Sequence, residues 1–461
     1  MILLSFLAFS LPILTGILII HLLWVEKKRP IDLIFKLTLG IGLGLGISSL
    51  LYFVYLIFFA GSPYFLYVEL VLFLAALLAA YLKNKKTTQV YLPKLSVSFL
   101  QITVLIIAAV VFVFSFLGVI NYARQRSHGD WDAWMIYNRS ARFMYRGQEN
   151  WKDAFSKDMG IIFHADYPPL LALNIASRWD ILSEETSYVP MFQSILFSFA
   201  VLGLCFGALA SLKSLGQAGL GVVLLGGVSF FLSEGGRQTA DVPLAFYMLA
   251  SIVLLFFYYC EKRPILIILS GFTVGLAAWT KNEGVFFMLV SAGVMVIFAL
   301  WKRFFGDFLL YLAGLLLPAL LLFYFKFQIT RPNEFLSGDS SKMVQYIMDT
   351  SRHQMIFNSF KNFFLHGGGW NYIGIFLILS VYFLLFHSRI KDNLEAVFIS
   401  LAIFAFQIMG YYVFYLISPN DLEWQMNYSL NRLFVQIYPA VVFVILFASQ
   451  SPEIIFSSDL K

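Results

Sequence analysis

Runs of apolar residues separated by short polar segments recur along the whole 461-residue chain. Most runs have roughly 17 to 25 residues, the length at which an α-helix crosses the hydrocarbon core of a membrane. The shortest run, 218–232, is rich in Gly and Val. The pattern predicts about thirteen transmembrane helices, near 2–24, 34–59, 65–82, 96–120, 187–212, 218–232, 243–260, 264–280, 285–301, 308–328, 370–387, 394–417 and 433–449.

The composition agrees with an all-α polytopic membrane protein. Hydrophobic residues make up 60% of the chain, charged residues 13%, and the mean hydropathy is +0.80, far outside the range of soluble domains. The net charge of +6 is interpreted as a signal of membrane topology, so we expect no nucleic-acid partner. Cys205 and Cys260 both fall inside predicted helices, which leaves no disulfide framework and no thiolate metal site.

Lysine and arginine clusters predict the orientation, because these residues are retained on the cytoplasmic side. In the thirteen-helix pattern all such clusters fall on one face: Lys27-Lys28-Arg29, Lys83 with Lys85-Lys86, Lys213, Lys262-Arg263, Lys302-Arg303, and Arg389 with Lys391. The other face receives the N-terminus, the long segments 121–186 and 329–369, and the polar turns 233–242, 281–284 and 418–432. We therefore expect an integral membrane protein with the N-terminus outside and the C-terminus in the cytoplasm.

Candidate chemistry is concentrated after the fourth apolar run. Residues 1–95 have few polar side chains in their apolar runs apart from Glu69, and they are interpreted as accessory transmembrane helices. Residues 96–461 are then the catalytic transmembrane core, including the outer loops 121–186 and 329–369. The second loop has a Gly367-Gly368-Gly369 hinge and is expected either to close over substrates or to be a solvated surface loop.

The sequence Gly129-Asp130-Trp131-Asp132-Ala133-Trp134 places two acids and two indoles just after an apolar run. Segment 131–146 is predicted to be a helix lying along the membrane interface. At 100° per residue, Arg139 and Arg146 would lie within about 40° of Asp132. That stripe suggests a carboxylate base beside an anion site, or alternatively ordinary salt bridges on an interfacial helix.

Farther along the same loop lies His164-Ala165-Asp166-Tyr167-Pro168-Pro169. His164 and Asp166, with Asp132, have side chains that can bind a divalent cation. The alternative is that Asp166 caps the following helix and His164 only packs.

Three further polar patches border predicted helices on the same face. In the first, Asp241 precedes Pro243, which fits either a helix N-cap or a site residue alongside Arg237. In the second, Lys281 and Glu283 lie at the membrane rim, although a tight turn does not require these charged residues. In the third, which contains Glu423, Arg432 opens a predicted helix where its charge is unfavourable to the helix dipole, so an anionic partner is expected.

From about Gly129 to Pro439 the chain resembles the GT-C superfamily of integral-membrane glycosyltransferases. The resemblance is found in GDWDAWMIYNRSARFMYRG, HADYPPLL, QTADVPLAFYMLA, GLAAWTKNEGVFF and DLEWQMNYSLNRL, in that order. The chain is similar to a bacterial branch of this superfamily, which implies a bacterial inner membrane, and more distantly to protein O-mannosyltransferases and the aminoarabinose transferase of lipid A.

The resemblance implies a GT-C-like core, a polyprenyl-phosphate sugar donor, inversion at the anomeric carbon, and a lipid, glycan or protein acceptor at the extracytoplasmic face. It matches Asp132 to the catalytic acid and Asp166 to the second acidic position. Asp130 stands where the family pattern has Gly, which leaves a rival carboxylate. Some relatives use a metal at such acids and others do not, so a metal cofactor stays open.

The chemistry of these residues fits glycosyl transfer. A carboxylate near a membrane interface suits a general base, here Asp132. The phosphate leaving group needs cations, for which Arg139, Arg237, Lys281 and Arg432 are candidates, with Asp241, Glu283 and Glu423 beside them. The competing classes are an O-antigen polymerase or ligase, a lipid-linked-sugar transporter or flippase, and a structural or receptor role. A transporter would place charges near helix midpoints.

Overall fold

The structure is a computed structural model that describes residues 1–24, 30–84, 98–156, 158–160, 163–330, 340–368, 373–387 and 393–458. These residues are almost entirely helical, with one isolated β-bridge between His387 and Ser449. The basic residues 27–29, 85–86, 389 and 391, as well as Gly369 and Lys461, lie outside the described residues. The prediction of an all-α polytopic membrane protein is confirmed.

Ten helices in the described part of the chain are long and apolar enough to cross a membrane. They are α1 and α2 together (Ile2–Leu7 and Ser10–Leu23), α3 (Pro30–Phe59), α4 (Phe65–Asn84), α5 (Phe99–Gln125), α8 (Tyr188–Leu212), α11 (Asp241–Glu261), α13 (Asn282–Lys302), α14 with η4 (Phe305–Tyr324 and Phe325–Ile329), α18 (Leu394–Ile417) and α19 (Leu422–Ala448).

Three of the thirteen predicted helices differ from this group. The run at 218–232 is a pair of helices, α9 (Leu215–Gly226) and α10 (Ser229–Gly236), bent by 67°, and it makes an eleventh candidate if the pair is one span. The runs at 264–280 and 370–387 form the shorter helices α12 (Pro264–Ala278) and α17 (Ile375–Phe386). By length, the described helices thus give ten or eleven candidate spans.

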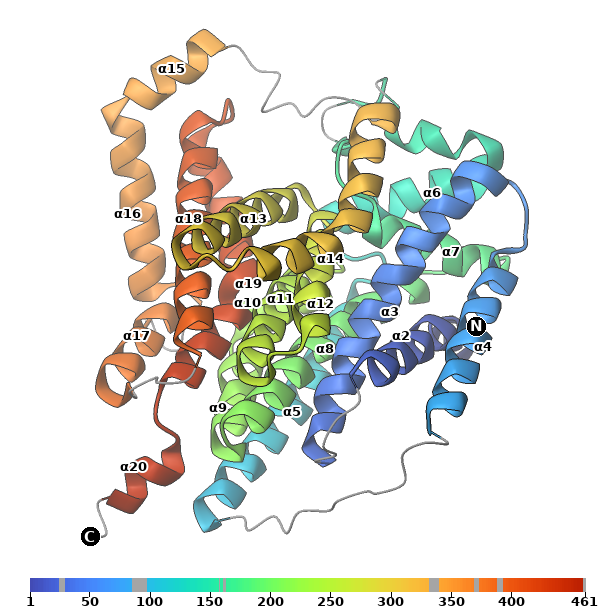
Figure 1. The fold of residues 1–461 in the computed structure, drawn as a ribbon. Coiled ribbons are helices and arrows are strands. Elements are labelled where there is room, and N and C mark those ends of the chain that lie inside the picture. The colour runs from blue at the N-terminus through green and yellow to red at the C-terminus, as the bar shows by residue number, and fades with distance from the viewer. Residues whose placement is uncertain are drawn as a thin grey trace.

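The remaining helices belong to the polar segments. The first long segment forms η1 (Ala133–Tyr137), α6 (Asn138–Gly147), η2 (Gln148–Phe155) and α7 (Leu170–Leu182). The second forms α15 (Ser340–Met348) and α16 (Thr350–His366), and α20 (Pro452–Ser458) follows α19. Figure 1 shows α15 to α17 along one side of the bundle and α2 to α4 along the opposite side.

Helix α11 is the axis of the bundle, because its apolar window is entirely buried and it packs against α8, α12, α18 and α19 (Figure 1). We name the two ends of the bundle after the first and last residues of α11, Asp241 and Glu261. At the Asp241 end, Asp241 meets Arg432 of α19. At the Glu261 end, Glu261 accepts a hydrogen bond from the Trp24 indole, and Asn393 lies next to Cys260.

The segment 329–369, predicted either to close over substrates or to be a solvated surface loop, is helical in its described part, and most residues of α15 and α16 are exposed. The Arg352 guanidinium donates to the carbonyl oxygens of Tyr415 (2.9 Å), Leu416 (3.2 Å) and Ser418 (2.8 Å) at the C-terminal end of α18. The Tyr415 carbonyl also accepts from the Ser418 N–H at 3.4 Å, but carbonyls at the end of a helix lack the full set of helical hydrogen bonds, so a cation there helps to satisfy them and suits the helix dipole. Helix α16 is therefore fixed to the bundle at its first turn.

Candidate functional site

Four segments of the chain bring charged side chains together in a buried group at the Asp241 end, and we call this group the charged cluster. Its centre is the fully buried carboxylate of Asp241, at the first residue of α11. This carboxylate accepts hydrogen bonds from Arg432 Nε (2.9 Å), Lys281 Nζ (3.0 Å) and Gln436 Nε2 (2.8 Å). A buried carboxylate is stable only with such partners. The prediction that Asp241 could be a helix N-cap is wrong, since α11 has Ala240 as its N-cap and no side-chain cap.

Asp132 joins the charged cluster through Arg432. Its Oδ2 accepts a hydrogen bond of 2.5 Å from Arg432 Nη2, across a separation of 300 residues in sequence. Its Oδ1 has no hydrogen-bonding partner among the described residues, and the Asp132 side chain is 12% exposed. One guanidinium thus bridges two carboxylates, and one oxygen of Asp132 stays available to a substrate.

Lys281 completes the charged cluster between Asp241 and Glu283, with Nζ 2.8 Å from Glu283 Oε1. Burial opposes the charged form of Lys281, but the two carboxylates outweigh it and raise the pKa of the ammonium. Lys281 is therefore charged at neutral pH. With three carboxylates against two cations, the charged cluster has one negative charge in excess.

The position of Arg432 corrects its predicted setting. Helix α19 begins at Leu422, so Arg432 lies about three turns inside it rather than at its start. The helix-dipole argument fails, but the expected anionic partners exist within the chain as Asp132 and Asp241. Glu423, in the first turn of α19, is exposed and does not join the charged cluster.

A second polar group lies beside the charged cluster and contains Asp166. Its Oδ2 accepts from Asn282 Nδ2 at 2.7 Å, and Asn282 Oδ1 accepts from Lys326 Nζ at 2.6 Å. Asn282 connects this group to the charged cluster, because it stands between Lys281 and Glu283. The N-cap alternative for Asp166 is wrong, since α7 follows Pro169 without a side-chain cap.

The structure adds no support for a metal at His164 and Asp166. No three His, Cys, Asp or Glu side chains come together as a metal-binding group in the described segments. The His164 ring stacks on Tyr167, with 4.7 Å between ring centroids. Burial lowers the pKa of the His164 imidazole although Asp166 acts in the opposite direction, so the ring is neutral near pH 7.

Asp130 and Asp132 bind different cations although they are two residues apart. Asp130 pairs with Arg126 (2.5 Å) and with Arg237 (2.8 Å), and Arg237 also pairs with Glu234. Gly129 makes this turn possible, because its φ is +73° and a Cβ there would lie 2.5 Å from the Ala133 Cβ.

The predicted stripe of Asp132, Arg139 and Arg146 does not form. Asp132 is the N-cap of η1, a π-helical turn, which changes the angular register before α6. The Arg139 guanidinium lies 4.6 Å from the centre of the Phe163 ring, and Arg146 pairs with Glu185 at 2.5 Å.

Five of the sequence-predicted site residues therefore meet in the charged cluster: Asp132, Asp241, Lys281, Glu283 and Arg432. Asp166 lies beside it, and Asp130 pairs with Arg237 outside it. The sequence reasoning missed Lys326 and Gln436. Both are polar residues inside apolar runs, and that isolation is the signal that could have found them.

Comparison with models of protein families, with curated proteins and with solved structures finds no match to this chain.

Proposed function

We propose that this protein is a GT-C type glycosyltransferase that moves a sugar from a polyprenyl-phosphate donor to an acceptor at the extracytoplasmic membrane face. The observation that supports it best is the meeting of Asp132, Arg432, Asp241 and Lys281 from four separate segments. A carboxylate with one available oxygen, beside buried cations, suits attack by a hydroxyl on a carbon that bears a phosphate.

In the proposed reaction, Asp132 Oδ1 takes the proton from the acceptor hydroxyl as its oxygen attacks the anomeric carbon. The bond from that carbon to the phosphate oxygen breaks, and the polyprenyl phosphate leaves with the electron pair. The anomeric configuration inverts because attack and departure occur on opposite faces.

The cations of the charged cluster are all paired with carboxylates when no substrate is bound. We propose that the donor phosphate displaces Asp132 from Arg432, so that donor binding supplies a cation to the leaving group and frees the base in one step. Lys281 contributes a second positive charge, fixed by Asp241 and Glu283. Such preorganised charges stabilise the negative charge that develops on the phosphate.

We also propose thirteen crossings of the membrane, with the Asp241 end extracytoplasmic and the C-terminus cytoplasmic. Besides the ten long helices, three further passages support this number. The α9–α10 pair ends just before Arg237, which lies at the Asp241 end. Helix α12 begins shortly after Glu261 and ends shortly before Lys281, so it connects the two ends of the bundle. Helix α16 starts beside Ser418, and α17 ends at Phe386, whose carbonyl accepts a hydrogen bond from the Gln450 backbone beyond α19.

The proposal is tested with membranes that contain the protein and labelled polyprenyl-phosphate sugars. Asp132→Asn is expected to slow transfer by about 10²- to 10⁴-fold, as loss of a general base does. Asp130→Asn is the matched neighbour and Asp153→Asn an exposed control in the same loop, and both are expected to keep transfer within a few-fold of the parent. Unchanged transfer by Asp132→Asn would refute the assigned base, and loss only in Asp130→Asn would move the role to Asp130.

The second candidate is a transporter of lipid-linked sugars, favoured by the burial of Arg432 inside α19. In reconstituted vesicles a transporter would move a labelled lipid-linked sugar between leaflets without consuming it. Release of free polyprenyl phosphate together with a glycosylated product favours the transferase and excludes transport alone.

A further inference from the structure

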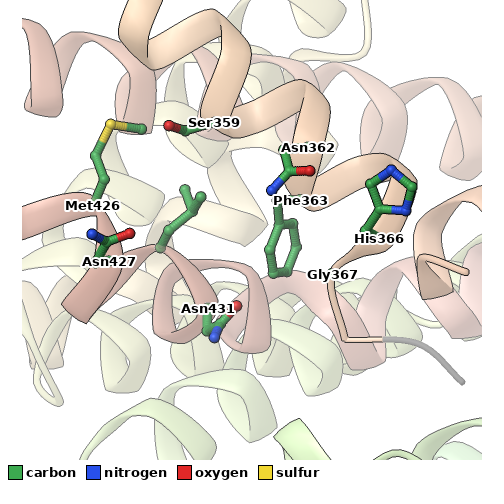
Figure 2. A pocket seen from close by; sticks show the side chains of 9 residues that line it. Ser359, Asn362, Phe363, His366, Gly367, Met426, Asn427 and Asn431 are labelled. Carbon is green, nitrogen blue, oxygen red and sulfur yellow. The ribbon is translucent and has the colours of Figure 1, made fainter. Parts of the chain in front are cut away.

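A cavity of about 250 Å³ lies between α16 and α19, apart from the charged cluster. Figure 2 shows the side chains of Ser359, Asn362 and His366 on α16 and those of Asn427 and Asn431 on α19 around it. The spacing on α16 is three and four residues and that on α19 is four, so each set lies along one face of its helix. Two polar stripes therefore face each other across the cavity.

The lining has a definite chemical character. Its described lining residues include no Asp, Glu, Lys or Arg, with His366 as their titratable group, and the apolar part comes from Phe363, Met426 and Leu430. The side chains of Asn362, Asn427 and Asn431 are exposed and make no hydrogen bonds within the described part of the chain, while Phe363 and Leu430 beside them are buried. Exposed carboxamides next to an apolar surface can exchange water for the hydroxyl groups of a ligand.

The ligand that fits this lining is neutral and rich in hydroxyl groups. A carboxamide offers both donors and an acceptor, and a hydroxyl group also donates and accepts, so the two are complementary in either orientation. Among the described lining residues a cationic ligand meets no carboxylate, and an anionic ligand meets no lysine or arginine but only the His366 imidazole. The volume of the cavity matches a single sugar ring better than an extended peptide.

The cavity also has a defined relation to the charged cluster. Asn431 directly precedes Arg432 in α19, so the two side chains leave the helix at the same level and about 100° apart. The Arg432 guanidinium lies over the Tyr428 ring, with 5.7 Å to the centroid, on the face that meets Asp132. Helix α19 thus separates a charged region from a neutral polar one.

We infer that the cavity between α16 and α19 binds a neutral sugar residue of the acceptor, while the charged cluster takes the phosphate of the donor. The word acceptor rests on the proposed function, whereas the binding of a neutral sugar rests on the lining alone. The inference assigns a role to α16, which is fixed to α18 through Arg352 and forms one wall of the cavity.

The test uses the full-length protein in detergent and ligand-detected saturation-transfer NMR. The probes are a neutral hexose, an N-acetylhexosamine, a hexose 1-phosphate, a hexuronate and an uncharged tripeptide. The two neutral sugars are expected to bind. Their binding is expected to weaken at least tenfold in Asn362→Leu and in Asn431→Leu, because each variant removes hydrogen-bonding groups from one wall.

Asn358→Leu is the matched control, since Asn358 is an exposed asparagine of α16 that does not line the cavity. Asn362→Ala and Asn431→Ala remove the carboxamide without adding a leucine side chain, so they show whether weaker binding comes from lost hydrogen bonds or from the leucine. Both variants are first checked to elute as folded protein. Equal binding of neutral sugars by parent and cavity variants would overturn the inference, as would no binding of neutral sugars by the parent. Preference for the charged sugars or the tripeptide would overturn it as well.

Asp132→Asn separates this inference from the proposed function. That variant is expected to lose transfer and to keep the cavity-dependent binding of neutral sugars. Binding by the parent that disappears in the cavity variants, in a protein with no transfer activity, would support the sugar site and refute the acceptor role.

Discussion

Among single residues, Arg432 matters both for the geometry of the charged cluster and for the stability of the protein. Its guanidinium bonds to Asp132 (2.5 Å) and to Asp241 (2.9 Å), and all three groups are nearly or fully buried. A planar guanidinium can bridge two carboxylates in a fixed geometry, which an ammonium cannot. Arg432 therefore holds Asp132 in position and stabilises the buried negative charge of Asp241.

Replacing Arg432 with Met is expected to lower the free energy of unfolding by about 3–5 kcal/mol, because it leaves buried carboxylates without a partner. Thermal unfolding in detergent measures the change. Arg146→Met is the matched control, since Arg146 is exposed and pairs with Glu185 at the surface, and it is expected to leave the melting temperature unchanged. Equal melting of both variants would contradict a structural role for the Arg432 bridge.

Asp180 in α7 is expected to make stability depend on pH. Burial raises the pKa of its carboxyl from 3.8 to about 6, although a hydrogen bond from the Tyr52 hydroxyl acts in the opposite direction. Between these two values the folded chain binds more protons than the unfolded chain, so this group lowers stability as the pH rises through that window.

Asp180→Asn resembles the protonated form and keeps an acceptor for Tyr52. Its melting temperature is expected to equal that of the parent near pH 4 and to exceed it near pH 7.5, by the equivalent of about 2–3 kcal/mol. The two proteins differ only at residue 180, so a change with pH in the difference between their melting temperatures is assigned to Asp180. A difference that does not change between the two pH values would refute this origin.

At the level of elements, the helix α7 connects the first long polar segment to the N-terminal helices. Arg178 of α7 is buried and bonds to Glu69 of α4 (2.5 Å), to Ser48 of α3 (3.1 Å) and to the Ala8 carbonyl (2.7 Å). The division at residue 95 into accessory and catalytic parts stays a prediction, but the two parts share this buried ion pair.

Arg178→Met is expected to destabilise the protein by about 3–5 kcal/mol, because it leaves the Glu69 carboxylate buried and unpaired. The double variant Arg178→Met with Glu69→Leu is expected to recover most of that loss, since an apolar pair of similar volume avoids the desolvation cost. Unfolding of the four proteins of this cycle gives the coupling between the two residues. Additive effects of the two substitutions would contradict the ion pair.

For the whole molecule, the number of crossings determines where the termini lie. Ten crossings put both termini on the same side of the membrane, whereas eleven or thirteen put them on opposite sides. The described helices satisfy the length criterion for ten spans, or eleven with the bent pair α9–α10. The short helices α12 and α17 do not meet the length criterion, and they count as crossings only in the proposal of thirteen.

Reporters at both termini and an accessible tag near Ser340 test the arrangement. The reporter after Lys461 is expected in the cytoplasm, and the N-terminus and the Ser340 tag are expected outside. A cytoplasmic Ser340 would refute the extracytoplasmic site, and termini on the same side would refute thirteen crossings.

The sequence predicted the helical membrane class and most helix positions, because helix length and hydropathy are local properties of twenty or so neighbouring residues. It also predicted that Asp132, Asp241, Lys281 and Arg432 belong to one site, because charge topology placed them on one face. It did not predict the start of α19 correctly, since residues 422–432 are polar and their helix is stabilised by packing against the bundle.

The tertiary structure alone decided which charges pair. Residues Asp132 and Arg432 are 300 positions apart, and nothing in their local sequence favours that pair over Asp132 with the nearby Arg139. The π-helical turn at η1 and the depth of Arg432 in α19 settle the choice, because ion pairing depends on distances of a few ångströms that only the packed helices define. The sequence by itself thus determined where the charges gather along the chain and the membrane, and the packing of the helices determined their partners.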